Sequence, residues 1–350
     1  MNRERLEQIL QSLAKVKLIV FGDYFLDYYL VIDRKISEVS LETGLEAYQV
    51  IETRKAPGAA GTVVSNLRAL NVSVQAVGLM GDDGNGYNLK RRLQENQVDL
   101  DGIIEVAGYQ TPTYMKPMVR DTDGSEHDLN RMDIKPRKEL TTYLEKSLME
   151  KLYRLFPSSD GMLVVDQVQE HNYGNVTDRM RSELKMLADR YPQKVISVDS
   201  REYLSLFERV MLKSNVKEAL KATQLESRAN ENLIDTAERC GRALVQKTGK
   251  AVIITLGSAG LYVIENIHTD GYYLPAIKVK GALDIVGAGD SVHASIGAAL
   301  CAGASLIEAA ALGNLSASIV IQQIGTTGTA SAEQIISQFD AHPEVPYFEQ

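Results

Sequence analysis

The chain has no tryptophan, only two cysteines and no uninterrupted apolar segment of membrane-spanning length. Cys240 and Cys301 provide neither a disulfide framework nor the spacing of a metal site, so we expect a reducing, cytoplasmic location. The first 15 residues alternate in charge and lack the apolar core of a secretory signal. The stretch 294–320 is apolar but interrupted by glycine and polar residues, which favours two buried helices over a membrane span.

Basic residues are fewer than acidic ones, 38 against 46, and the 350-residue chain has a net charge of −8. This charge disfavours nucleic acids and anionic membranes as partners. A hydrophobic content of 44% is enough for a sizeable core. No linker, repeat or low-complexity segment divides the sequence, so we expect one domain over residues 1–350.

Short apolar runs alternate with helical segments along most of the chain. The runs are rich in β-branched residues and bounded by glycine or polar turns, as in strands buried on both faces. This alternation predicts a three-layer α/β/α sandwich with a mainly parallel central sheet. The predicted strands lie within 17–23, 72–81, 161–167, 194–200 and 251–257, and the clearest helices are 87–95, 177–190 and 232–247.

Two stretches, within 24–50 and 109–133, interrupt this alternation. The second of them predicts two strands around a turn at 121–124. Because both follow early strands of the main sheet, we expect them to pair into a small β lid that covers a site and belongs to the same domain.

The segment DIVGAGD, ending at Asp290, precedes an apolar helix of small residues. The N–H groups of Gly287, Ala288 and Gly289 would point out of the helix N-terminus, where an anion is favoured. Asp290 would lie beside that anion as a base, an arrangement that phosphoryl transfer to an alcohol requires. A glycine-rich turn capped by Asp290 is the alternative, but the additional Asp284 favours the functional interpretation.

With this motif the chain resembles the ribokinase-like (PfkB) carbohydrate kinases, whose signature is D-T-x-G-A-G-D. Four further landmarks follow in the family's order and cover nearly the whole chain: GDYFLD at 22–27, PGAAG at 57–61, NVKE at 215–218 and TLGSAG at 255–260. Within the family the chain looks most like the heptose-phosphate kinase domains of bifunctional kinase/adenylyltransferases. That likeness depends on the N-terminal helix and on residues 113–116, 130–133 and 313–326.

The resemblance implies ATP and Mg²⁺ as cofactors, with Asp290 as the catalytic base. Glu218 would act on Mg²⁺ through its water shell, and Asp284 would help order its loop, around a monovalent cation such as K⁺ bound by carbonyl oxygens. The residues implied to lie along the nucleotide are Asn215, Thr255, Gly257, Gly260 and Asn314. Each also has a structural reading, as a strand end, a hairpin or a helix turn.

On the acceptor side the resemblance implies Asp27 as a ligand of sugar hydroxyls, since a carboxylate accepts two donors. Gly58 would lie in the same pocket. Lys116 and Arg131 would face the sugar or its phosphate, although a solvated lid strand is an equally good reading. Lid strands in this family often pair between subunits, which predicts a homodimer. The implied partner is a small-molecule sugar or sugar phosphate.

Three positions depart from the family pattern. Pro57 and Gly61 replace a glycine and the sugar-binding asparagine of G-G-A-A-N, and Ile285 replaces the signature threonine. We therefore expect a kinase whose acceptor is a sugar, a sugar phosphate or a nucleoside-like polyol. A catalytically weak sugar or nucleotide sensor is the alternative. A nicotinamide-dependent dehydrogenase is disfavoured, because no G-x-G-x-x-G follows the first strand.

Overall fold

The computed structural model describes residues 1–121, 123–228, 231–325 and 327–347. Its centre is a nine-stranded sheet in which neighbouring strands from β7 to β14 are parallel, while β15 and β16 are added antiparallel. All five predicted strands are present. In spatial order the strands are β16 (Tyr272–Pro275), β15 (Gly260–Ile264), β14 (Val252–Thr255), β13 (Met211–Asn215), β12 (Val195–Ser200), β11 (Gly161–Asp166), β1 (Lys17–Gly22), β6 (Ser73–Gly81) and β7 (Asp99–Val106).

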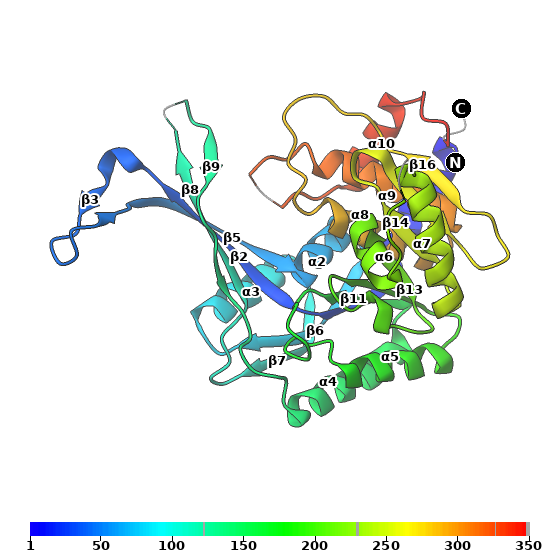
Figure 1. Cartoon of the computed structure of the whole chain (residues 1–350), viewed down its shortest axis with the longest axis horizontal. Coiled ribbons are helices and arrows are strands. Elements are labelled where there is room, and N and C mark those ends of the chain that lie inside the picture. The colour runs from blue at the N-terminus through cyan, green and yellow to red at the C-terminus, as the bar shows by residue number, and fades with distance from the viewer. Residues whose placement is uncertain (122, 229–230, 326, 348–350) are drawn as a thin grey trace.

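Helices cover both faces of this sheet (Figure 1). Alternate side chains of β1 enter two separate cores: Leu18 and Val20 pack on one face, Ile19 and Phe21 on the other. The predicted three-layer sandwich is therefore confirmed. One layer contains α1 (Arg3–Leu13), α2 (Ala60–Ala69), α3 (Gly84–Glu95), α8 (Ala288–Cys301), α9 (Leu306–Val320) and α10 (Ala332–Ala341), and the other contains α4 (Thr142–Leu155), α5 (Asp178–Arg190), α6 (Val216–Thr223) and α7 (Leu233–Thr248).

The apolar stretch 294–320 forms α8 and α9, as predicted, and both helices are buried for most of their length. A capping box between Ser305 and Glu308 starts α9 and separates the two helices. Within the described residues, no helix is both long and apolar enough to cross a membrane.

A second sheet forms the predicted lid, with strand order β10-β8-β2-β5 and β9 paired to β8. Its strands are β2 (Tyr24–Ile32), β5 (Val50–Ala59), β8 (Thr113–Arg120), β9 (Glu126–Asp128) and β10 (Met132–Ile134). β8 and β9 are antiparallel, as predicted for the turn at 121–124, although residue 122 of that turn lies outside the described residues. Beyond β2 the chain extends into an arm that carries the short pair β3 (Glu38–Val39) and β4 (Glu46–Ala47) away from the body (Figure 1).

Candidate active site

A cleft of about 1330 Å³ lies between the lid and the carboxyl ends of the parallel strands. From β1 the sheet grows outward through β6 and β7 on one side and from β11 to β14 on the other. Such a reversal of strand order is where open α/β sheets bind ligands. Lid strands, the ends of β12 and β13, the segment before α8 and the loop after α9 all line this cleft.

The start of α8 supplies main-chain donors to the cleft. Gly287 is the N-cap residue with φ of 81°, a left-handed conformation that favours glycine, and no side chain caps the helix. In the described part of the chain, no acceptor pairs with the N–H groups of Gly287 and Gly289, whereas Ala288 donates weakly to the carbonyl of Ile285 at 3.3 Å. Asp284 orders the segment by accepting the N–H of Val286 at 3.0 Å. The arrangement matches an anion-binding helix N-terminus.

Asp290 lies in the first turn of α8 and lines the same cleft. Burial raises the pKa of its carboxyl to about 7, an effect that the nearby Lys213 ammonium opposes and Asp199 reinforces. A carboxyl group with a pKa near neutrality is suited to accept a proton at physiological pH.

Lys213 and Asp199 were not identified from the sequence, yet both line the cleft. They occupy directly paired positions on β13 and β12, and the Lys213 Nζ lies 2.5 Å from Asp199 Oδ2. A charged residue at the carboxyl end of an apolar parallel strand was the available signal. Arg54, on lid strand β5, was also missed; it donates to the carbonyl of Gly325 at 3.3 Å and so links the lid to the loop after α9.

Asn215 and Glu218 form a reciprocal capping box at the start of α6. Asn215 Oδ1 accepts the Glu218 N–H at 2.9 Å, and Glu218 Oε2 accepts the Asn215 N–H at 2.8 Å. Both line the cleft. The structural reading is therefore present, and it is compatible with the predicted functional one. Burial and the neighbouring Asp199 raise the pKa of Glu218. Glu218 Oε1 makes no hydrogen bond to any described residue, which leaves an oxygen for the water shell of a hard cation.

The residues predicted on the acceptor side come together on the lid. Asp27 is buried, and its Oδ2 lies 3.1 Å from Lys116 Nζ. Burial disfavours the charged form of Lys116, but the interactions of its ammonium with Asp27 and Tyr29 favour it more strongly, so the pKa of Lys116 is raised. Arg131 lines the same cleft 4.1 Å from the ring centre of Tyr114. It forms a bidentate ion pair with Asp133.

Gly58 is needed where β5 passes Asp27. A Cβ at this position would lie 2.9 Å from Asp27 Oδ1. The glycine therefore leaves room for the buried carboxylate and does not itself line the cleft.

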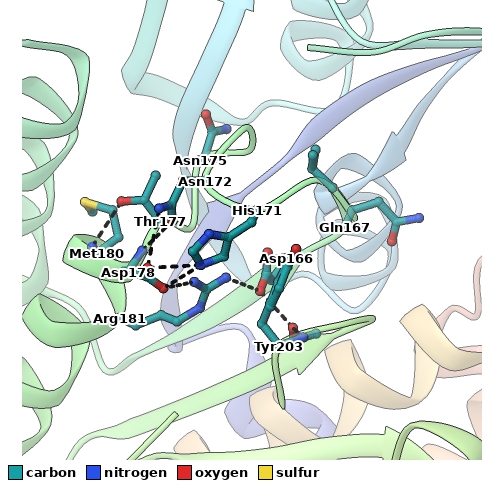
Figure 2. A network of polar contacts seen from close by, with 12 residues as sticks. Asp166, Gln167, His171, Asn172, Asn175, Thr177, Asp178, Met180, Arg181 and Tyr203 are labelled. Atoms are coloured by element: carbon teal, nitrogen blue, oxygen red, sulfur yellow. Dashed lines mark hydrogen bonds and ion pairs between the residues drawn. The ribbon is translucent and has the colours of Figure 1, made fainter. Parts of the chain in front are cut away.

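A partly buried polar network fixes the loop that follows β11, and Gln167 in this loop lines the cleft (Figure 2). Arg181 donates to Asp166 at 3.1 Å and to Asp178 at 2.8 Å. Burial raises the pKa of Asp166 to about 7, while Arg181 acts in the opposite direction. Asp23, just before the first lid strand, accepts the N–H of Gln167 at 2.8 Å and thereby ties the loop to the lid.

Four residues predicted along the nucleotide lie outside this cleft. Thr255 Oγ1 donates to the carbonyl of Ser214, Gly257 is exposed in the turn before β15, and a Cβ on Gly260 would overlap the backbone of β16. Asn314 is buried, and its amide donates to the Pro275 carbonyl at 3.2 Å and to the Tyr347 hydroxyl at 3.0 Å. These contacts agree with the structural reading of Asn314, and its place along the nucleotide stays a prediction.

A family model described as pfkB family carbohydrate kinase matches residues 26–333. The chain belongs to this family. It is 28% identical over 324 residues to the bifunctional protein HldE of a Nitratiruptor species, covering 92% of this chain and 64% of that protein. Its identity to the bifunctional protein HldE of Desulfatibacillum aliphaticivorans is 27%, covering 91% of this chain and 62% of that relative. The chain thus spans less than two thirds of the length of these relatives.

Solved structures of carbohydrate kinases share the fold. Phosphofructokinase-2 from Escherichia coli in complex with potassium gives a TM-score of 0.71 at 19% identity, covering 93% of this chain and 99% of that one. Arabidopsis thaliana ribokinase complexed with ribose and ATP gives a TM-score of 0.66 at 16% identity, covering 92% and 98%. The predicted family and its ribokinase-like fold are therefore confirmed.

Two of the departures from the PfkB family pattern depend on each other in space. A Cβ on Gly61, in the first turn of α2, would overlap the Cβ of Pro57. The proline therefore excludes an asparagine at position 61 unless the backbone moves. The third departure, Ile285, is 79% exposed and replaces a hydroxyl with an apolar side chain at the cleft.

Proposed function

We propose that this PfkB-family chain transfers the terminal phosphoryl group of ATP to a hydroxyl of a sugar or sugar phosphate. The observation that supports this most directly is the start of α8. There the N–H groups of Gly287 and Gly289 and the carboxyl of Asp290 face one cleft. Charge on a transferring phosphoryl group needs fixed donors, and the attacking hydroxyl needs a base.

Asp290 takes the acceptor proton in this mechanism. With a pKa of about 7, its carboxylate form is substantially populated at neutral pH. The N–H groups of Gly287 and Gly289 stabilise charge on the phosphoryl oxygens, helped by the helix dipole. Glu218 would act on Mg²⁺ through its water shell, and Mg²⁺ would neutralise phosphate charge. Asn215 would lie near the nucleotide phosphates, and Asp284 would order the loop in which a monovalent cation such as K⁺ would bind.

The acceptor is proposed to bind at the lid, between Asp27 and Asp290. Asp27 would accept hydroxyl donors, while Lys116 and Arg131 would bind an anionic substituent. These two cations favour a phosphorylated acceptor, such as a heptose 7-phosphate, over a neutral sugar. Asp133 pairs with Arg131 and Asp27 with Lys116, so each cation is already neutralised in part.

An acceptor screen with coupled detection of ADP tests the proposal. The panel contains heptose 7-phosphate, fructose, ribose and the phosphates of the latter two, each with MgATP and with Na⁺ or K⁺. Acceptor-dependent ADP production is expected from at least one phosphorylated member. Thermal stabilisation by ATP or a sugar without ADP from any acceptor would favour the sensor instead.

The lid arm supports a homodimer. Its apolar side chains are unusually exposed: Val39 is 69%, Leu41 104% and Leu45 70% exposed. A second copy that packs its lid against this arm would bury them and cover the strand edges.

The same proposal treats residues 1–350 as one kinase domain. Its free cysteines, Cys240 and Cys301, agree with a reducing, cytoplasmic location.

A further inference from the structure

Lys213 lies directly beneath the proposed anion-binding turn. Its side chain is only 7% exposed, and it reaches the cleft from β13. A Cβ built on Gly289 would lie 3.0 Å from Lys213 Nζ, so the ammonium group lies next to the turn that precedes Asp290. Burying an ammonium is costly unless it is paired. Packing alone therefore does not explain why a lysine is buried at this position.

Asp199 accepts a hydrogen bond from this ammonium but does not use all of its N–H donors. The pair is 2.5 Å apart across adjacent strands. A lysine ammonium has three N–H donors. Over the ranges that the structure describes, Asp199 is the one hydrogen-bond acceptor of Lys213, so two donors remain for a ligand in the cleft.

The charges around Lys213 keep it protonated. Burial alone would favour the neutral amine, but Asp199, Asp290 and Glu218 outweigh this effect and raise the lysine pKa. The same carboxylates would repel a phosphate that approached Gly287 and Gly289. A fixed cation at this point removes that repulsion, and Arg201, which also lines the cleft, adds a second positive charge.

We propose that Lys213 is a further catalytic residue, whose ammonium binds the terminal phosphate of the nucleotide as it rests on the N–H groups of Gly287 and Gly289. This inference depends on the proposed kinase function. In this proposal Lys213 supplies the positive charge at the end of the cleft where the phosphoryl group binds, and Asp199 holds the lysine side chain in position. Because ADP lacks the terminal phosphate, the contact distinguishes ATP from ADP.

Calorimetric titration with MgATP and with MgADP, without acceptor, tests the contact. A charge-assisted hydrogen bond corresponds to roughly 10- to 100-fold in affinity. Lys213→Met is expected to weaken ATP by that factor while ADP changes less than about threefold. Lys185→Met, which removes an exposed lysine of α5 paired with Glu208, is the matched control and should change neither.

Two further variants separate binding from structure. Asp199→Asn keeps the ammonium and is expected to retain most of the preference for ATP over ADP. If Lys213→Met leaves Asp199 unpaired and unfolds the chain, D199N/K213M removes both charges and gives the same comparison. Equal losses for ATP and ADP, or no loss for either, would overturn the assignment.

The outcomes for the two proposals remain distinct. A chain that binds ATP but turns over no acceptor contradicts the kinase proposal, and the ATP-to-ADP comparison still decides the role of Lys213. A chain that binds no ATP contradicts both.

Discussion

Replacing Asp290 by asparagine is expected to make the protein more stable and nearly inactive. Burial raises the pKa of this carboxyl to about 7, against about 3.9 in an unfolded chain. Between these values the folded state binds more protons than the unfolded state, so the free energy of unfolding falls as the pH rises. Above pH 7 the cost of the poorly solvated carboxylate is about 4 kcal/mol.

Asp290→Asn removes this cost together with the attraction to Lys213. We therefore expect a gain of about 2–4 kcal/mol at pH 8, shrinking towards pH 4.5, where the folded carboxyl is protonated anyway. Calorimetric unfolding of both proteins at the two pH values measures the difference. Turnover should fall by roughly 100-fold or more, with ATP affinity little changed.

The matched control is Asp189→Asn on α5, an exposed carboxylate whose Oδ1 lies 2.8 Å from Arg209 Nε. Its effect should stay within about 0.5 kcal/mol at either pH. The reasoning would be refuted if Asp290→Asn destabilised the chain at pH 8, or if its effect were the same at pH 4.5.

Three other substitutions test separate parts of the structure. Gly58→Ala places a Cβ 2.9 Å from Asp27 Oδ1, so steady-state kinetics should show an acceptor KM raised about tenfold with an unchanged KM for ATP; parallel changes in both would count against an acceptor role for Asp27. Gly61→Asn should lower stability by about 1–3 kcal/mol in thermal unfolding because of Pro57, and P57G/G61N should recover most of it; an unaffected single variant would show that the two positions are independent. Leu41→Glu on the exposed arm should shift sedimentation from dimer to monomer, and an unaltered chain that is already monomeric would contradict the dimer.

The three-layer arrangement of the fold could be predicted from the sequence. Continuous apolar runs such as 161–167 can be buried on both faces only in a covered parallel sheet. Helical periodicity predicts α1, and the interrupted apolar stretch 294–320 predicts the buried helices α8 and α9. The lid was predicted from strand alternation, but the arm at 38–47 was not, because its apolar residues face solvent rather than a core.

The site was predictable where local geometry determines it. The turn at Gly287 requires a positive φ, and the sequence pattern around it shows that requirement. Lys213 was not identified although a charged residue at the end of an apolar strand was a signal, and its pairing with Asp199, 14 residues away, could not be predicted from any local pattern. The contacts of Asn314 could not be predicted for the same reason, because its partners Pro275 and Tyr347 are 39 and 33 residues away in the chain.

The most direct test of the phosphoryl-transfer proposal follows the labelled phosphate itself. The chain is incubated with ATP labelled at the terminal phosphate and with the acceptor chosen by the screen, and the products are separated. Label in an organic phosphate ester, formed in equal amount to ADP and roughly 100-fold or more slowly with Asp290→Asn, is the predicted result. Label released only as inorganic phosphate, or transfer at an unchanged rate without the Asp290 carboxylate, would contradict it.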